Sequence, residues 1–594
     1  MSAQFFKVEP SKSSSVDFTW KIGGEAGWGI KSAGLNLSKA FVRGGYHVFS
    51  YDEYPSLVRG GHNCYQARIS SEKVRSQVLD VDILVALNKE TFDLHISELK
   101  PHAAVIYDGR HFNLVDPTDK KLRLINIPLR EIIKKHEAME IMMNNVALGA
   151  TIALVDYDFD ILAGIISDQF ANKGEEIIKQ NIKVARAGYD HFKKNYPSVK
   201  LLSLTPLPPL PHPHQDSRLL LTGNEAIALG AVSGGVKFFP AYPMTPASSI
   251  LHSLAEWAQE LGLVVVQTED EISAVNMAIG GAYSGVRTVT ATSGGGFCLM
   301  TEGLGLAGMT ETPLVIVNAQ RPGPATGVPT WTEQGDLRFT LHAHQGTFPR
   351  VIAAPGDVAE AFEVTINALN LAEKYQLPVI ILTDKLLSES HESTEVFDYQ
   401  GVKIERGKIH KESQSDSSKY GRYAFTKDGI SPRAFPGTAN ITVRANSDEH
   451  DEFGFSTEDS KIRIAMMNKR QMKLKHLDKE LPQPRLYGPP QAPLTVVGWG
   501  TTKGPILEAQ KMLTAAGIPT NFLHFVYLTP FPLETVTKVL NQSKKILDVE
   551  GNFDAALAGL IREKTGIEIK EKLLKYDGRP FYPSEIVNRV KSLV

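Results

Sequence analysis

The chain has 594 residues, with 64 Lys and Arg, 66 Asp and Glu, a net charge of -2 and 42% hydrophobic residues. Because a domain averages roughly 150 residues, this length predicts three or four domains. The balanced charge argues against nucleic acid as a partner, since phosphate backbones attract an excess of cations. No run approaches the roughly 20 apolar residues of a membrane helix. The N-terminus lacks the apolar core of a signal peptide, so we expect a cytoplasmic protein.

Cysteine usage is sparse, with only Cys64 and Cys298 in the chain. Two cysteines exclude a disulfide scaffold and fall short of the four thiolates that usually hold an iron-sulfur cluster. We therefore expect each thiol to be a small buried residue, and the chain to carry neither a metal site nor a cluster of its own.

Residues 1–200 are predicted to form an α/β domain, because β-like runs alternate with helical stretches. The runs are FTWKIGG, YHVFSY, DILVALN, AAVIYDG and LRLINIP. A glycine-rich turn follows the first run and resembles a phosphate cradle, with glycines at Gly24, Gly27 and Gly29. Its spacing is not that of a dinucleotide fingerprint, although Asp52 or Glu53 could be the acidic residue of a nicotinamide site. Arg59 stands in a second glycine-rich loop, which suits either a coenzyme phosphate or a subunit contact.

A proline-rich linker is predicted at residues 201–217, because its prolines favour an extended conformation and remove backbone donors. His212 and His214 alternate within it. On an extended spacer, two histidines are more often solvated than bound to metal.

Residues 218–390 are predicted to form a second α/β domain with a parallel sheet. Its apolar runs are VKFFPAY, LVVVQT, TVTATS, PLVIVNAQ and PVIILTD. In such sheets, ligands bind just past the carboxyl ends of the strands. The segments that follow the first four runs carry the candidate functional residues.

The first two segments offer a hydroxyl group and a carboxylate. Pro246 restricts Thr245 to an extended conformation, which fixes the position of its hydroxyl group. After Glu271, small residues recur at helical spacing and allow close packing against the helix, at Ala274, Ala278 and Ala282. A carboxyl group there can share a proton with a cofactor ring nitrogen. Glu269 and Asp270 compete for this role, and three adjacent acids can equally form a solvated first helical turn.

The third and fourth segments offer backbone donors and a cation. Gly294 and Gly295 lack side chains, so their N–H groups can approach a ligand. Arg321 stands in a loop stiffened by prolines, and its guanidinium group matches a carboxylate with two hydrogen bonds. Thr326 and Thr330 add hydroxyl groups beside it. This set suits an α-keto acid, although a surface arginine could have the same sequence context.

Residues 391–490 are polar and irregular, and we expect an extended arm or insertion. The acidic run 448–452 is expected to be a solvated loop, because consecutive residues rarely all face one ion. Residues 491–594 return to the α/β alternation and predict a further domain. The predicted fold class is therefore α/β, with three α/β domains.

Several motifs together resemble the 2-oxoacid:ferredoxin oxidoreductase family, in the form where a γ-like domain precedes the α subunit. They are GGEAGWG, VRGGHN, LTGNEAIALGA, YPMTP, QTEDEISAVNMAIGGAY, TATSGGG and NAQRPGPATG. The resemblance covers nearly the whole chain, with Met244 where the family more often has isoleucine. It implies a γ-like domain, then a doubly wound pyrimidine-binding domain for thiamine diphosphate, and last a transketolase C-terminal-like domain.

The resemblance also implies roles for the candidate residues. Glu271 would contact the aminopyrimidine ring of thiamine diphosphate, beside Gly294 and Gly295. The 2-oxoacid carboxylate or coenzyme A would be held by Tyr242, Thr245, Arg321, Thr326 and Thr330. The contacts of the first domain with coenzyme A or another subunit would involve Gly24, Gly27, Gly29 and Arg59.

No GDG segment, through which thiamine enzymes bind Mg2+ and the diphosphate, occurs in the chain. The resemblance therefore implies a β subunit that carries Mg2+ and a [4Fe-4S] cluster, in an assembly of two αβ pairs. The implied reaction is the oxidative decarboxylation of a 2-oxoacid to acyl-CoA and CO2 with reduction of ferredoxin, or its reverse.

The fused γ-α layout suggests 2-oxoglutarate, ahead of pyruvate, branched-chain or broad-range oxoacids. Two alternatives are a self-contained thiamine enzyme, against which the missing GDG counts, and a non-catalytic nucleotide-binding scaffold for electron transfer.

Overall fold

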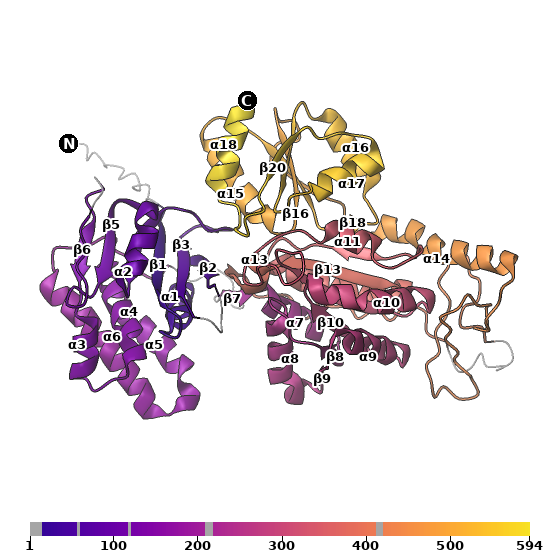
Figure 1. Cartoon of the computed structure of the whole chain (residues 1–594), viewed down its shortest axis with the longest axis horizontal. Coiled ribbons are helices and arrows are strands. Elements are labelled where there is room, and N and C mark those ends of the chain that lie inside the picture. Colours follow the sequence, from indigo (N-terminus) through magenta and orange to yellow (C-terminus); the bar gives the residue numbers. More distant parts are fainter. Residues whose placement is uncertain (1–14, 56–59, 117–119, 208–217, 411–419) are drawn as a thin grey trace, which may run out of the picture. The chain divides into compact units, whose positions relative to one another are not determined.

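A computed structural model of the chain describes residues 15–55, 60–116, 120–207, 218–410 and 420–594 (Figure 1). Arg59, His212 and His214 lie outside these ranges. The chain divides into two compact units, residues 1–50 with 57–220 and residues 51–56 with 221–594. Among the described residues, no helix combines the length and apolarity needed to cross a bilayer.

The first unit has a mixed sheet in the strand order β6-β5-β4-β1-β3-β2. Five of these strands coincide with the predicted runs: β1 (Asp17–Glu25), β2 (His47–Glu53), β4 (Val81–Ala86), β5 (Leu99–Tyr107) and β6 (Arg123–Asn126). The strand β3 (His62–Ser70) was not expected, and it pairs antiparallel with β1. The sequence of this segment is too polar to be predicted as a strand, yet its side chains Gln66 and Arg68 are buried. Arg68 compensates by binding Asp17 through two hydrogen bonds of 3.0 and 2.7 Å.

Helices cover this sheet, and four of them gather on one side of it in Figure 1. These are α3 (Leu129–Lys135), α4 (Met143–Leu154), α5 (Phe159–Gln169) and α6 (Glu175–Asn195). Every residue of α4 is buried, so this helix forms the centre of the layer. Gly149 on α4 and Gly188 on α6 face the backbone of the opposite helix, where a Cβ atom would overlap a carbonyl oxygen. The missing side chains therefore let α4 and α6 pack closely.

The second unit contains the predicted parallel sheet, in the order β10-β11-β13-β12-β18. Its strands are β10 (Val289–Thr292), β11 (Leu314–Gln320), β12 (Val351–Ala353), β13 (Pro378–Asp384) and β18 (Tyr527–Thr529), of which β18 is antiparallel. The predicted first two runs form a separate parallel pair, β8 (Phe238–Ala241) and β9 (Val264–Gln267). A single bridge between Phe238 and Thr288 joins this pair to the larger sheet.

Alternating side chains of β11 enter two different cores. Val315 and Val317 belong to the core beneath α7 (Gly223–Ser233), α8 (Ser248–Leu261) and α12 (Val358–Tyr375). Leu314 and Ile316 belong to the opposite core, beneath α9 (Glu271–Tyr283) and α10 (Gly294–Met309). Since successive side chains of a strand point to opposite faces, a run that is apolar throughout requires helices on both faces. The doubly wound α/β arrangement follows.

The C-terminal sheet of the second unit has the order β15-β17-β16-β19-β20. Its strands are β15 (Arg485–Tyr487), β16 (Thr495–Trp499), β17 (Asn521–Phe525), β19 (Ile546–Glu550) and β20 (Glu571–Leu574). Figure 1 places α15 (Lys503–Ala515) and α18 (Pro583–Leu593) on one face, and α16 (Leu533–Gln542) and α17 (Ala556–Thr565) on the other. β15 begins this sheet a few residues before residue 491, where the sequence predicts the domain to start.

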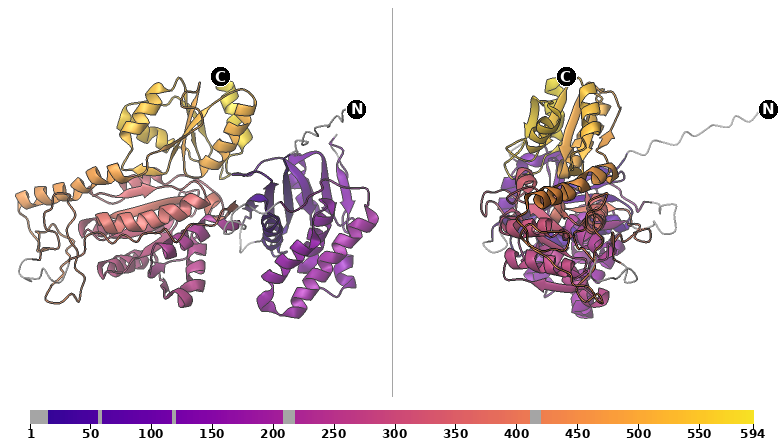
Figure 2. Two further views of the ribbon diagram at one scale, coloured as in Figure 1. Left: turned by 180° about the vertical axis from the view of Figure 1, so that it is seen from behind. Right: turned by 90° about the vertical axis from the view of Figure 1, so that its right-hand side faces the viewer.

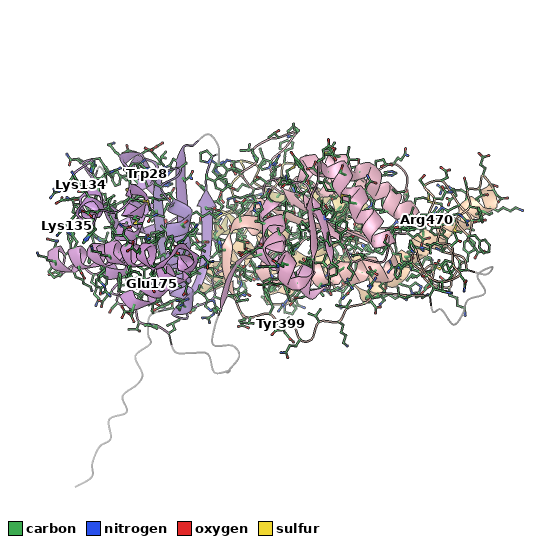
Figure 3. All side chains as sticks on the ribbon, turned by 90° about the horizontal axis from the view of Figure 1, so that it is seen from below. Trp28, Lys134, Lys135, Glu175, Tyr399 and Arg470 are labelled. Atoms are coloured by element: carbon green, nitrogen blue, oxygen red, sulfur yellow. The ribbon has the colours of Figure 1, made fainter. Side chains whose placement is uncertain are left out.

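The arm between these sheets starts with β14 (His391–Thr394) and ends with a long helix, α14 (Ser460–Glu480). In Figures 1 and 2, α14 extends beyond the helices of the middle sheet. The acidic run that we expected to be a solvated loop is tied to this helix. Glu449 accepts hydrogen bonds of 3.0 and 2.8 Å from Arg470, an α14 residue that is labelled in Figure 3. Arg463 forms a further ion pair with Glu449, of 2.5 Å.

Candidate active site

The carboxylate predicted at the start of a helix is Glu271, the first residue of α9. Asp270 caps the helix instead, accepting a 2.8 Å hydrogen bond from the Ser273 N–H group. Glu269 is exposed, whereas the Glu271 side chain is buried, with 2% of its surface accessible. The fold therefore distinguishes three adjacent acids that the sequence left in competition.

The buried carboxylate of Glu271 meets the end of β10. Thr292, the last residue of that strand, donates a 3.2 Å hydrogen bond to Glu271 Oε1. Met244 Sδ lies 3.9 Å from the same threonine hydroxyl group. A Cβ atom on Gly296 would overlap both Glu271 Oε1 and Thr292 Oγ1, so α10 can begin here only without a side chain. Among the described residues, Thr292 is the single hydrogen-bond partner of the Glu271 side chain. Oε2 therefore has no hydrogen bond within the described structure and is able to accept one from a ligand.

Arg321 follows β11 and extends toward the same place. Its Nη1 donates a 2.7 Å hydrogen bond to the backbone oxygen of Thr245, while its buried Nε has no partner among the described residues. Burial lowers the pKa of Arg321, and the charges of Asp336 and Glu271 partly offset this. The structure thus brings together the three predicted residues Glu271, Thr245 and Arg321, which come from three different loops.

Asp336 is a site residue that sequence reasoning missed. It lies 15 residues beyond Arg321 in a loop with no helical or strand pattern, and it accepts a 3.1 Å hydrogen bond from Asn318 Nδ2. Burial raises its pKa, against the opposing effects of Asn318 and Arg321. A Cβ atom on Gly294 would lie 2.6 Å from Asp336 Oδ2, so the glycine admits this carboxylate to the start of α10. Thr292 was also missed, although it stands only two residues before Gly294 in sequence.

The remaining predicted residues differ in exposure. Thr330 is 7% exposed, and its hydroxyl oxygen is buried without a partner in the described structure. Tyr242 and Thr326 are exposed. A Cβ atom on Gly295 would make an ordinary van der Waals contact with the Ala325 carbonyl oxygen, 4.0 Å away. This glycine therefore lies beside the loop that bears Arg321.

The same loop carries a further acid, Glu333. Burial, together with the smaller effects of the Asp336 and Asp554 charges, raises the pKa of Glu333 to about 7. The next residue, Gln334, fixes the loop to the C-terminal sheet: it donates 2.8 Å to the Trp499 carbonyl oxygen and accepts 2.8 Å from the Gly551 N–H group. The C-terminal sheet thereby holds the loop that bears Arg321.

The glycine turn of the first unit packs and also lines a cavity. Gly29 has φ of 70° and precedes α1 (Ile30–Arg43), and Gly27 has φ of 91°. Both lie in the left-handed region that favours glycine. A Cβ atom on Gly24 would be 3.0 Å from the Trp28 ring, so this position is tightly packed. Gly29, Asn36, Asn144, Asn145 and Asn181 line a cavity of about 320 Å³.

Asp52, a candidate for binding a nucleotide ribose, has another role. Lys385 is buried in the second unit and donates 2.7 Å to the Asp52 carbonyl oxygen, with its Nζ 3.3 Å from Oδ1. Asp52 thus serves as a counter-charge for a buried lysine, which does not favour the nicotinamide alternative.

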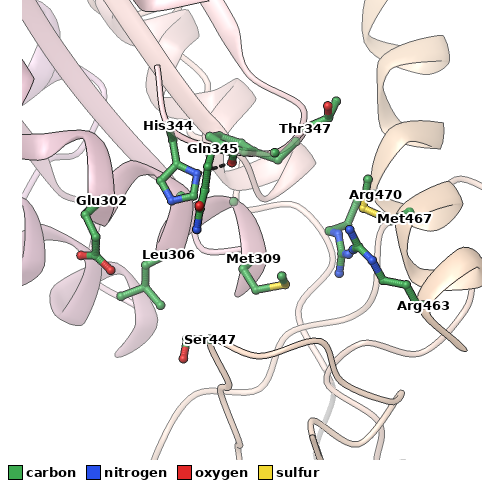
Figure 4. A pocket seen from close by; sticks show the side chains of 14 residues that line it. Glu302, Leu306, Met309, His344, Gln345, Thr347, Ser447, Arg463, Met467 and Arg470 are labelled. Atoms are coloured by element: carbon green, nitrogen blue, oxygen red, sulfur yellow. Dashed lines mark hydrogen bonds between the residues drawn. The ribbon is translucent and has the colours of Figure 1, made fainter. Parts of the chain in front are cut away.

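A further cavity of about 550 Å³ lies in the second unit, away from Glu271, Thr245 and Arg321. Figure 4 shows Glu302 and Leu306 of α10 on one side and Arg463 and Arg470 of α14 on the other. Both arginines already bind Glu449.

Comparison with known proteins gives consistent matches. Residues 229–469 match the family model "Pyruvate flavodoxin/ferredoxin oxidoreductase, thiamine diP-bdg", and residues 19–191 match "Pyruvate ferredoxin/flavodoxin oxidoreductase". The chain is 35% identical to a 2-oxoacid:ferredoxin oxidoreductase subunit alpha of Sulfolobus sp, over 96% of this chain and 95% of the relative. It is 27% identical to the 2-oxoglutarate oxidoreductase subunit KorA of Mycobacterium tuberculosis, over 98% and 92%.

A solved structure covers the same length. The 2-oxoglutarate:ferredoxin oxidoreductase from Magnetococcus marinus, with 2-oxoglutarate, coenzyme A and succinyl-CoA bound, is 33% identical. It superimposes with a TM-score of 0.90, over 97% of this chain and 99% of the other.

Proposed function

This chain belongs to the 2-oxoacid:ferredoxin oxidoreductase family, as an α subunit, and we propose that its substrate is 2-oxoglutarate. The proposed reaction converts 2-oxoglutarate and coenzyme A to succinyl-CoA and CO2, with the electrons passed to ferredoxin. The single observation that carries the proposal is the buried Glu271 carboxylate. It is hydrogen-bonded to Thr292 and lies near enough to Arg321 for the two charges to interact. The substrate choice is supported by the Magnetococcus marinus enzyme, which is similar over nearly the whole chain.

The residues of this site fit thiamine diphosphate. Among the described residues Glu271 Oε2 has no hydrogen bond and can accept one from a cofactor ring, while the missing side chain of Gly296 makes room for the carboxylate itself. When bound, thiamine diphosphate supplies the electron sink that decarboxylation of a 2-oxoacid requires. Glu271 would hold a proton at Oε2 in a hydrogen bond with the aminopyrimidine ring, since a general acid-base group must lie within hydrogen-bond reach of the proton that it transfers.

Arg321 is proposed to bind the substrate carboxylate. Its buried Nε lacks a partner in the described structure, and a carboxylate that accepted from Nε would satisfy it. The bond from Nη1 to the Thr245 carbonyl oxygen fixes the plane of the guanidinium group before substrate arrives. The Thr330 hydroxyl group is a second buried donor for the same ligand. Tyr242 and Thr326, which are exposed, are assigned to the entrance used by coenzyme A.

The remaining components are proposed to lie on a β subunit: Mg2+, the diphosphate contacts and a [4Fe-4S] cluster. This follows from the missing GDG segment and from a count of two cysteines. The cavity beside Gly29 is proposed to contribute to coenzyme A binding, since asparagine side chains can bond its amide and phosphate groups. A cytoplasmic location stays a prediction of the sequence.

A substrate panel tests the choice of 2-oxoglutarate. The chain would be assembled with its β subunit, and coenzyme A-dependent reduction of ferredoxin or viologen would be measured with 2-oxoglutarate, pyruvate and a branched-chain oxoacid. We expect the highest kcat/KM with 2-oxoglutarate. A higher kcat/KM with pyruvate would contradict the substrate assignment and leave the family unaffected.

The role of Glu271 is tested by Glu271→Gln in the same complex. We expect kcat to fall by about 100-fold to 10,000-fold, the range that general acid-base groups contribute, while the complex still assembles. Glu269→Gln is the matched control, since this neighbouring acid is exposed, and it should retain activity. Unchanged turnover in Glu271→Gln would remove the proposed role.

A further inference from the structure

Three side chains of metal-binding type converge in the first unit, on elements that the proposed active site does not use. His62 and Cys64 stand two residues apart on β3 and so point to the same face of the sheet. His95 ends α2 (Lys89–His95) above that face. One ring nitrogen of each histidine and the Cys64 sulfur lie within 4.8 Å of one another.

The spacing of the two rings is close to that of two ligands on one ion. His62 Nε2 and His95 Nε2 are 3.1 Å apart. Two imidazole nitrogens, each about 2.1 Å from a tetrahedral ion, lie about 3.4 Å apart, so a shift of a few tenths of an ångström suffices. A direct hydrogen bond between the rings would have the same distance, and the experiment below separates the two cases.

The sheet leaves room for this cluster at Gly23. Gly23 on β1 is the direct antiparallel partner of Cys64. A Cβ atom at Gly23 would lie 2.9 Å from His62 Cε1 and 2.6 Å from Thr91 Cγ2. The missing side chain of Gly23 thus lets the His62 ring lie beside Cys64. This role of Gly23 is separate from any role of the glycine turn that follows it.

A carboxylate orients one of the rings from behind. His95 Nδ1 lies 2.9 Å from Glu98 Oε1 and 3.4 Å from Lys21 Nζ. In the tautomer that metal binding requires, Nδ1–H donates to the carboxylate and Nε2 presents its lone pair toward His62. Glu98 also forms an ion pair with Lys21. Metal-binding histidines commonly have such a carboxylate on their second nitrogen. The orientation of His95 is therefore already that of a ligand.

We propose that His62, Cys64 and His95 bind one divalent transition-metal ion of the zinc class. A thiolate with two imidazoles suits Zn2+ or Co2+ and does not suit Mg2+ or Ca2+, which require oxygen ligands. Binding releases the Cys64 thiol proton to solvent and forms one sulfur–metal bond. His62 is half-buried, whereas Cys64 and His95 are buried. The fourth position of a tetrahedral ion would therefore open on the exposed side of the cluster, next to His62.

The test uses the metal-free full-length chain, titrated with Co2+ and then with Zn2+. We expect one Co2+ per chain with thiolate-to-cobalt charge-transfer absorption, which Zn2+ displaces. Cys64→Ser should abolish this absorption, and His95→Gln should weaken Co2+ binding at least about 100-fold. Glu98→Gln keeps all three ligands and should weaken it about 10-fold to 100-fold, the usual effect of losing such a carboxylate.

Two controls distinguish this site from the rest of the chain. Cys298→Ser removes the other cysteine, which is exposed on α10 of the second unit. His111→Gln removes an exposed histidine of the first unit, in which the proposed site lies. Both should bind Co2+ as the parent chain does. The proposal is overturned if the folded parent chain gives no thiolate absorption, or if Cys64→Ser retains it. Circular dichroism checks that each variant is folded. If Cys64→Ser is unfolded, the titrations of Glu98→Gln and of the parent chain decide whether the proposal stands.

Discussion

At the residue scale, burial distinguishes the roles of side chains between which the sequence cannot choose. Glu269, Asp270 and Glu271 are adjacent acids, yet one is exposed, one caps α9 and one is buried against Thr292. The geometry at the start of α9 explains the difference. The side chain of the cap residue, Asp270, turns back to accept from the helix N–H groups, and the side chain of the next residue, Glu271, faces the core. Arg321 is similarly distinguished by a buried Nε that has no partner in the described part of the chain.

Arg321→Lys tests the assignment of the substrate carboxylate. Lysine keeps the charge and loses the two parallel donors, so we expect kcat/KM for the 2-oxoacid to fall about 10-fold to 100-fold, mostly through KM. Steady-state kinetics of the αβ complex measures this. Arg338→Lys, on the exposed side of α11 (Leu337–His342), is the control and should change little. Equal effects of both substitutions would contradict a direct contact with substrate.

At the element scale, a buried ionic cluster holds α14 against the middle of the second unit. Glu311 forms ion pairs of 2.6 Å with Lys469 and 2.5 Å with Lys473, and all three side chains are almost fully buried. Burial lowers the pKa of Lys473 to about 7, although Glu311 raises it. For Glu311 the two lysines and Arg422 outweigh burial, so its pKa lies well below the ordinary 4.5. The arm is therefore fixed by charge as well as by apolar contacts.

Glu311→Gln should destabilise the chain by about 3–5 kcal/mol, because it leaves two buried ammonium groups without their carboxylate. Denaturant unfolding measures the loss. Glu480→Gln, at the exposed end of the same helix, is the matched control and should cost less than about 1 kcal/mol. A cost for Glu311→Gln as small as that of the control would show that the cluster does not hold α14.

The same cluster predicts a pH dependence. Because the folded pKa of Glu311 is depressed, its contribution to stability is present above the ordinary 4.5 and is lost as the pH falls below it. The free energy of unfolding should therefore decrease in acid for the parent chain. In Glu311→Gln the same acid limb should be shallower. Parallel pH profiles for the two proteins would contradict the depressed pKa.

At the scale of the whole molecule, the chain provides one part of a larger enzyme. It has the buried carboxylate and the arginine, and it lacks a GDG segment and the four cysteines that a cluster needs. We expect the purified chain to be colourless and without oxidoreductase activity, and to gain activity when its β subunit is added. Visible absorption and ferredoxin reduction check this. Turnover of a 2-oxoacid by the chain alone would contradict the division of the site.

The sequence alone determined the family, the α/β class and most strands of the first-unit sheet and of the parallel sheet of the second unit. Apolar runs with helical spacers specify parallel strands, and motifs such as YPMTP and NAQRPGPATG are specific because substrate chemistry restricts their residues. Thr245, Arg321 and the acidic segment 269–271 could be named from position, since the ends of parallel strands share one edge. The fold brought all three together.

Only the tertiary structure decided the contacts between segments far apart in sequence. Asp336 reaches Gly294 from a patternless loop, Glu311 meets α14 across more than 150 residues, and His95 approaches β3 from a helix. The strand β3 itself escaped prediction because its polar residues are compensated by distant partners such as Asp17. Local periodicity records which face of an element is buried, but the identity of the residue opposite depends on how the elements pack.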